Sequence, residues 1–163
     1  MNAIDLLTQQ HREVEDLFEE FEDAGEGALK TKERLCQRIS DALAVHAEIE
    51  EKIFYPAAKR DDTEELLRES LEEHLAVKRL VADLVQDAPE GAELDAKMQV
   101  LREQVEHHVE EEEGDLFPKT RKALSREELE EIGGRMQELA DDLESRGSPR
   151  DAVPGQTDAP PKI

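Results

Sequence analysis

Apolar residues recur every three or four positions along most of the chain, which is the spacing of α-helices that bury one face. The apolar stripes cover five segments, which are Ile4 to Phe21, Leu35 to Ile53, Leu67 to Leu84, Leu94 to Leu116 and Leu129 to Leu143. Glycine and proline residues separate these segments, as expected where helices end. The pattern therefore predicts an all-α protein.

The predicted boundaries carry residues that commonly begin and end helices. The first four stripes are followed, in order, by Gly25 and Gly27, by Pro56, by Pro89 with Gly91, and by Pro118. Asp61, Asp62 and Thr63 are N-cap candidates for the third helix, because their side chains can accept a hydrogen bond from its first turn. Ser125 with Glu128 forms a capping box that opens the fifth helix.

The first four predicted helices are long, at about 22 to 30 residues or roughly 33 to 45 Å each. Four such rods with short connections pack most simply as an up-down-up-down four-helix bundle, which we place at residues 1–124. Residues 125–145 are expected to form an additional C-terminal helix packed on the bundle. Residues 146–163 contain four prolines and two glycines and lack apolar periodicity, so we expect a disordered tail there.

Composition narrows the functional classes. The 163 residues carry a formal net charge of −22, which repels phosphate backbones, so nucleic acid is not an expected partner. Aromatic residues make up 3% of the chain, fewer than β-sandwiches and barrels normally use. The single cysteine, Cys36, excludes an intramolecular disulfide framework and a multi-cysteine zinc site. No apolar run approaches the roughly 18 residues of a membrane-spanning helix and no signal peptide is visible, so we expect a cytoplasmic protein without a membrane partner.

Four of the five histidines lie inside the apolar stripes, one in each of the first four predicted helices. They are His11, His46, His74 and His108. Glu50 and Glu112 follow the second and fourth of these histidines by one turn and share their helix faces. Buried carboxylates are costly unless a charge compensates them, and a metal cation would do so. The sequence therefore predicts a metal site inside the bundle with these six residues as ligands.

The arrangement repeats in the two halves of the chain. His46 follows His11 by 35 residues, and His108 follows His74 by 34. Each motif glutamate is followed by a second glutamate and, six residues on, by proline, in the segments HAEIEEKIFYP (46–56) and HVEEEEGDLFP (108–118). The halves look like two copies of one helical hairpin. Two equivalent sets of ligands facing each other make a two-metal centre the natural expectation.

The tandem His107–His108 leaves two registers open for the second motif, because His107 with Glu111 also fits the His-x-x-x-Glu spacing. We prefer His108 with Glu112 for two reasons. They stay in phase with the apolar stripe, and they keep the same distance from glutamate to proline in both halves. In this register His107 is a surface residue.

The neighbouring polar residues are assigned less directly. Glu51, Glu110, Glu111 and Glu113 are expected on the solvated face, although one of them could reach the site or a ligand. Tyr55 is out of phase with the ligands, which favours a packing role. A role for its phenol near the centre, as a hydrogen-bond donor or a ligand, stays open.

The chemistry of the ligand set favours iron, with manganese next and zinc after it, because four imidazoles and two carboxylates form a mixed nitrogen and oxygen site. The His-Glu-x-x-His signature of zinc proteases is absent, and so is the Glu-x-x-His motif of ferritin-like di-iron bundles. The site is therefore expected to be richer in imidazole than a ferritin-type centre.

At these six positions the sequence resembles the hemerythrin/HHE cation-binding domain family, over roughly residues 1–124. The helix that follows is similar to that of bacterial members. The resemblance implies a four-helix bundle around a non-haem centre of two iron ions, oxo- or hydroxo-bridged, with Glu50 and Glu112 bridging them. It also implies that His11 and His46 serve one iron, while His74 and His108 serve the other.

Two departures from the oxygen-carrying members bear on function. Lys78 stands where those proteins have a fifth histidine, and Glu112 stands where they have an aspartate. We therefore expect open positions on both irons and a small diatomic or peroxide ligand (O2, NO or H2O2) bound in a sensing or protective role, by a monomer or weak homo-oligomer. The alternatives are a catalase- or peroxidase-like enzyme, an iron-binding or iron-sensing protein, and a metal-free interaction bundle.

Overall fold

The structure is a computed structural model that describes residues 1–163 and contains helices but no strands. The α-helices are α1 (Ala3–Asp23), α2 (Leu29–Ile49), α3 (Tyr55–Ala58), α4 (Glu64–Asp87), α5 (Gly91–Glu111), α6 (Phe117–Ala123) and α7 (Arg126–Ser145). Two π-helical turns, η1 (Glu50–Phe54) and η2 (Glu112–Leu116), and a 3₁₀ helix, η3 (Pro149–Gln156), complete the chain. The prediction of an all-α fold is confirmed. None of the helices has the length and apolar character needed to cross a membrane.

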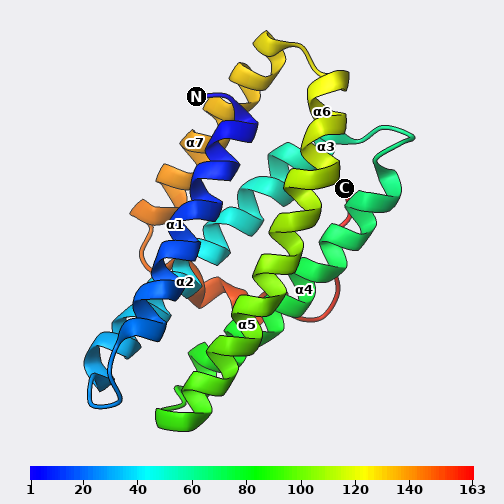
Figure 1. The fold of residues 1–163 in the computed structure, drawn as a ribbon. Helices are drawn as coiled ribbons and strands as arrows, with labels where there is room; N and C mark the ends of the chain where they lie inside the picture. Colours follow the sequence, from blue (N-terminus) through cyan, green and yellow to red (C-terminus); the bar gives the residue numbers. More distant parts are fainter.

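The helices α1, α2, α4 and α5 form the predicted up-down-up-down bundle, and α7 lies along α1 and α2 on the outside (Figure 1). The connection between α4 and α5 is tight, because Ala88 and Gly91 both adopt left-handed backbone conformations with φ of 42° and 61°. Thr63 is the N-cap residue of α4, one of the three candidates, although its hydroxyl donates to the carbonyl of Ala58 instead of capping the helix.

The sequence predicted that the second and fourth long helices end at Pro56 and Pro118. In the structure the helical path continues past both prolines. Proline has no N–H and its ring clashes with the carbonyl four residues back, so an α-helical ladder cannot pass it unchanged. In both places the turn before the proline is a π-helix, which is wider than an α-helix. The N–H of Tyr55 donates to the carbonyl of Glu50, and that of Phe117 donates to the carbonyl of Glu112. The helix then continues as α3 and α6.

The core is divided into two apolar clusters along the bundle axis. One contains 18 buried residues, among them Ile4, Leu71 and Met136, and the other contains 15, among them Phe18 and Met98. The buried histidines and motif glutamates occupy the layer between the two clusters. Such a polar layer is costly inside a bundle unless its groups are paired or bind a cation, so its place in the middle of the core points to function.

Helix α7 is positioned by its cap and by a close contact. The capping box is confirmed, since Ser125 Oγ accepts from the N–H of Glu128 and Glu128 Oε2 accepts from the N–H of Ser125. A Cβ atom on Gly133 would lie 2.4 Å from the carbonyl oxygen of Met1. The glycine therefore lets the start of the chain lie directly against α7, which buries Ile132 and Met136 beneath it.

The segment 146–163 differs from the disordered tail expected there. It forms η3 and lies across α2 and α4 (Figure 1). Val153 is buried at 2% exposure, and Arg150 binds Asp41 through both its N–H and its guanidinium. A single buried valine between two prolines leaves no helical periodicity, so the sequence pattern could not reveal this docking.

Candidate metal centre

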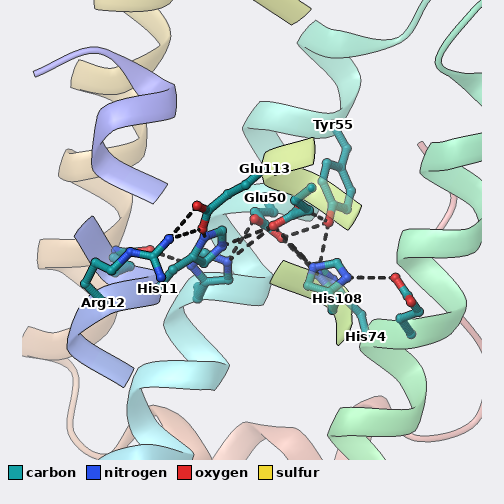
Figure 2. A network of polar contacts seen from close by, with 11 residues as sticks. His11, Arg12, Glu50, Tyr55, His74, His108 and Glu113 are labelled. Carbon is teal, nitrogen blue, oxygen red and sulfur yellow. Dashed lines mark hydrogen bonds and ion pairs between the residues drawn. The ribbon is translucent and has the colours of Figure 1, made fainter. Parts of the chain in front are cut away.

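Six buried side chains meet in the layer between the two apolar clusters (Figure 2). They are the six residues singled out in the sequence: His11, His46, Glu50, His74, His108 and Glu112. His11 faces His46 with ring centroids 4.8 Å apart. His74 faces His108 at 4.7 Å, with their Nε2 atoms 3.2 Å apart. The imidazoles therefore form two pairs, the grouping that the family resemblance implied.

The two carboxylates connect these pairs. Glu50 opens the π-helical turn η1, and its Oε1 lies 2.8 Å from Nε2 of His46 while its Oε2 lies 2.8 Å from Nε2 of His74. Glu112 opens η2, and its Oε1 lies 3.2 Å from Nε2 of His11 and 3.3 Å from Nε2 of His108. Each carboxylate therefore reaches both pairs. The ligand atoms group into two sets that share Glu50, so the geometry suits two neighbouring cations.

The other ring nitrogen of every imidazole is held from outside the centre. Nδ1 lies 2.7 Å from Glu113 for His11, 2.7 Å from Gln10 for His46, 2.7 Å from Glu51 for His74, and 2.9 Å from Glu73 for His108. Each of these partners offers an oxygen acceptor, so Nδ1 is the donor and Nε2 points inward. Metal-binding histidines are typically oriented in this way.

Two buried atoms at the centre lack a hydrogen-bond partner. Nε2 of His46 and Oε1 of Glu50 are 2.8 Å apart, but they are not aligned for a hydrogen bond. Orphaned buried polar atoms are rare in folded proteins and need an explanation. A cation has no such directional requirement and would satisfy both atoms at once. The residues present therefore fit a bound metal.

Charge at the centre is balanced by protons when no metal is bound. Burial lowers the pKa of His46, but the carboxylates of Glu50 and Glu112 outweigh it and raise that pKa to about 9. Burial also opposes the charged form of His108, yet Glu112 raises its pKa well above the usual range. The pKa of Glu50 is held well below its usual range, against its burial, by His46 and the other imidazoles. Metal ions compete with exactly such protons for imidazole nitrogens.

Tyr55 lies at the centre, contrary to the packing role expected for it. Its hydroxyl is 2.8 Å from Oε2 of Glu50, 2.7 Å from Oε2 of Glu112 and 3.1 Å from Nε2 of His74 (Figure 2). Burial, and then the two carboxylates, raise its pKa well above the usual range, so the phenol keeps its proton. The π-helical turn is the cause, since it places the fifth residue after Glu50 on the same face as that glutamate.

The sequence comparison agrees with this geometry. A family model described as the hemerythrin HHE cation binding domain matches residues 2–120. The chain belongs to this family. Among curated relatives of this hemerythrin-like domain, a DNA nickase of Nostoc sp. is 33% identical over 135 residues, which is 80% of this chain but only 37% of the nickase.

Other relatives match nearly the whole hemerythrin-like chain. The uncharacterized protein Rv2633c of Mycobacterium tuberculosis is 29% identical over 152 residues, covering 91% of this chain and 90% of that protein. The crystal structure of a hemerythrin HHE cation binding domain-containing protein from Mycobacterium kansasii, a homolog of Rv2633c, matches with a TM-score of 0.75. It covers 95% of this chain and 98% of that one at 22% identity, so it shows a shared fold.

Lys78 marks where this hemerythrin-like domain departs from the oxygen carriers. The side chain is buried, and its Nζ lies 2.7 Å from Oε1 of Glu51, whose Oε2 binds Nδ1 of His74. Lys78 therefore supports a histidine through a carboxylate. On the other side of the site, Arg12 similarly holds Glu113, which binds His11 (Figure 2).

Glu51 and Glu113 thus reach histidines of the hemerythrin-like site. The sequence analysis expected these neighbouring glutamates mainly on the solvated face. A signal was available, because each directly follows a motif glutamate in its half of the repeat. In the structure His108 and Glu112 lie at the centre, as in the register that the sequence analysis preferred. His107 is 60% exposed and lies outside, 3.3 Å from Glu73 and 3.2 Å from Glu111.

Proposed function

We propose that the protein is a non-haem di-iron protein that binds a small diatomic or peroxide ligand, O2, NO or H2O2, in a sensing or protective role. The observation that carries the proposal is the convergence of four imidazole Nε2 atoms on two carboxylates, each imidazole held from behind by an outer acceptor. Imidazole with carboxylate is a ligand set that suits iron.

In this proposal His11 and His46 hold one iron, His74 and His108 hold the other, and both glutamates are shared. Each iron then has about four protein ligands, fewer than the six of an octahedral ion. When bound, such a pair supplies reversible one- or two-electron redox change and vacant positions for a small ligand. The protein's own part is to orient the imidazoles, to exclude bulk water and to keep the two positions adjacent.

Tyr55 favours a second candidate, a catalase- or peroxidase-like enzyme. Its hydroxyl keeps a proton within hydrogen-bond distance of both carboxylates and His74. A positioned proton donor is what cleavage of a peroxide bond requires, because the leaving oxygen must be protonated. Tyr55→Phe removes the hydroxyl with little change in shape. We expect it to keep its metal and to slow peroxide breakdown, if that reaction occurs, by about 10² or more.

The decisive experiment is elemental analysis and optical spectroscopy of protein purified without added metal. Two irons per chain, with near-ultraviolet and visible absorption that changes on adding H2O2 or NO, are expected. Negligible metal would refute the proposal and favour a metal-free interaction bundle, whereas zinc alone would refute the di-iron centre and leave a metal site. Oxygen release from H2O2 no faster than with free iron would eliminate the catalase-like candidate and leave ligand binding.

The activity named for the Nostoc relative is not part of this proposal. The present chain covers 37% of that nickase, so the activity can reside in the remainder. A net charge of −22 also opposes contact with a phosphate backbone. A nicking assay on supercoiled plasmid is expected to show no cleavage beyond that of free iron.

A further inference from the structure

The C-terminal segment closes one side of the buried site. After α7 the chain turns back and η3 crosses α2 and α4 (Figure 1), and two of its residues line a cavity that the histidines also line. We call residues Pro149–Gln156 the C-terminal strap. Its Val153 is 2% exposed and belongs to the apolar cluster that also contains Leu43 and Val81. The strap is therefore docked on the bundle through a buried side chain.

A small cavity lies between the strap and the imidazoles. Its volume is about 40 Å³, and its lining includes His11, His46, His74 and His108 together with Val153 and Gln156 of the strap. Most of the remaining lining is alanine, valine and leucine. A cavity needs about 10 to 15 Å³ of such volume to hold one water molecule. This cavity thus has room for about three water-sized groups beside the imidazoles, so that a diatomic molecule or H2O2 fits and a branched organic molecule does not.

The strap is fastened at both ends by contacts that do not line the cavity. At its start, Asp41 accepts from the N–H of Arg150 at 3.0 Å and from its guanidinium at 2.8 Å. Just beyond its end, Arg79 donates to the carbonyl of Thr157 at 3.1 Å. The fasteners can therefore be removed without altering any residue of the metal centre.

We propose that the C-terminal strap is the specificity-determining wall of the ligand pocket. Val153 and Gln156 limit the space facing the imidazoles, so that O2, NO and H2O2 fit while alkyl hydroperoxides are excluded until the strap moves. The ligand class rests on the function proposed above, whereas the position of the wall does not. The two parts can therefore be tested separately.

The wall is tested on metal-free protein with diethyl pyrocarbonate, which acylates accessible imidazoles. Exposed His107 serves as the reference within each molecule, and peptide mass spectrometry reports its modification and that of the four buried histidines. Arg150→Ala unfastens the strap and Val153→Ala thins the wall. We expect both to speed modification of the buried histidines relative to His107 by about tenfold, since reaction of buried groups follows local opening.

Two control variants separate this effect from general destabilisation. Arg126→Ala removes an exposed arginine that pairs only with Glu130, and it should leave the ratio unchanged. Met136→Ala removes packing beneath α7, away from the strap, and loosens the fold without unfastening it. An unchanged ratio in both strap variants, or an equal rise in Met136→Ala, would overturn the proposal.

The ligand class is tested on iron-loaded protein by the rates of spectral change with H2O2 and with tert-butyl hydroperoxide. The natural sequence should react with H2O2 at least about tenfold faster, and the strap variants should raise the tert-butyl hydroperoxide rate while changing the H2O2 rate less than about twofold, because fit within a pocket sets such discrimination. Equal rates in the natural sequence would overturn the size limit. Lack of iron would instead contradict the proposed function, and the acylation result would still decide the wall.

Discussion

Replacing Lys78 by methionine tests whether the ion pair behind His74 supports the fold and the metal site. The ammonium lies 2.7 Å from Glu51, and both side chains are less than 10% exposed. Removing one partner of a buried ion pair typically costs about 3 to 5 kcal/mol, because the other charge is left without compensation. We expect the lower end, since Nδ1 of His74 still donates to Glu51.

The assay is urea unfolding of the metal-free protein, with the free energy of unfolding compared between variants. Lys52→Met is the matched control, since Lys52 is 61% exposed and pairs with Glu48 on the surface. Its loss should cost no more than about 1 kcal/mol. Equal destabilisation by the two substitutions would refute the view that Lys78 compensates a buried charge.

The double variant Lys78→Met with Glu51→Gln separates stability from metal binding. Both charges are then absent, so much of the stability should return. The amide oxygen can still accept from His74, but it makes the imidazole a weaker ligand than a carboxylate does, so iron affinity measured by chelator competition should fall by about 10- to 100-fold. Full recovery of affinity along with stability would show that Glu51 merely fills space.

Three further predictions concern the centre itself. His108→Ala should lose iron while His107→Ala keeps it, as measured by elemental analysis, and the reverse result would restore the other register. The pKa of His46 is raised to about 9, so its contribution to the stability of the metal-free protein is complete below the unfolded-state pKa of about 6.5 and is lost as pH rises through about 9. Urea unfolding at pH 6 and at pH 9.5 should show a lower free energy of unfolding at the higher pH. A higher value at pH 9.5 would refute the sign. Chelation should lower the melting temperature, because bound metal stabilises the folded state by several kcal/mol; an unchanged melting temperature would contradict a metal held by these residues.

The six central residues could be found from the sequence because helical periodicity is a fixed geometric rule. Once His11 and Val14 lie in one apolar stripe, the imidazole must face the interior of the bundle. The same rule brings Glu50 beside His46 one turn later. The four-helix bundle could be predicted in the same way, because helical periodicity gives the length of each helix and the connections between the helices are short.

Tyr55 escaped that rule because the rule assumes an unbroken α-helix. In an α-helix the inward residue after Glu50 would be its fourth successor, Phe54, whereas the π-helical turn brings the fifth inward. The turn depends on Pro56, which the sequence analysis took as a helix end. Both halves share this spacing, since Phe117 follows Glu112 by five residues and stacks on His11 at 5.9 Å. The aromatic residue five positions after the motif glutamate in both halves was therefore a sequence signal for the inward position of Tyr55.

The outer partners and the strap could not be derived from periodicity alone. Glu73 and Gln10 reach their histidines across a helix interface, so their roles depend on how deeply the rods approach each other. The docking of Val153 depends on one apolar side chain in a segment without a repeat. Such contacts are set by tertiary packing, which no single-helix pattern encodes.

The pseudo-twofold repeat extends to these outer partners, and the places where it fails distinguish the two sides of the centre. Gln10 directly precedes His11 and accepts from His46, just as Glu73 directly precedes His74 and accepts from His108. On the His74–His108 side both acceptors are therefore carboxylates, whereas the His11–His46 side has one neutral amide. Carboxylate acceptors raise the basicity of a ligating imidazole.

The aromatic residues break the symmetry in the same direction. Tyr55 stacks on His74 and offers a hydroxyl, whereas its counterpart Phe117 stacks on His11 and offers none. The two carboxylate acceptors and the single buried phenol thus coincide on one side of the centre. In the proposed di-iron centre the two metals would have equivalent histidines but different surroundings, and the one buried phenol that holds a proton lies on the His74–His108 side.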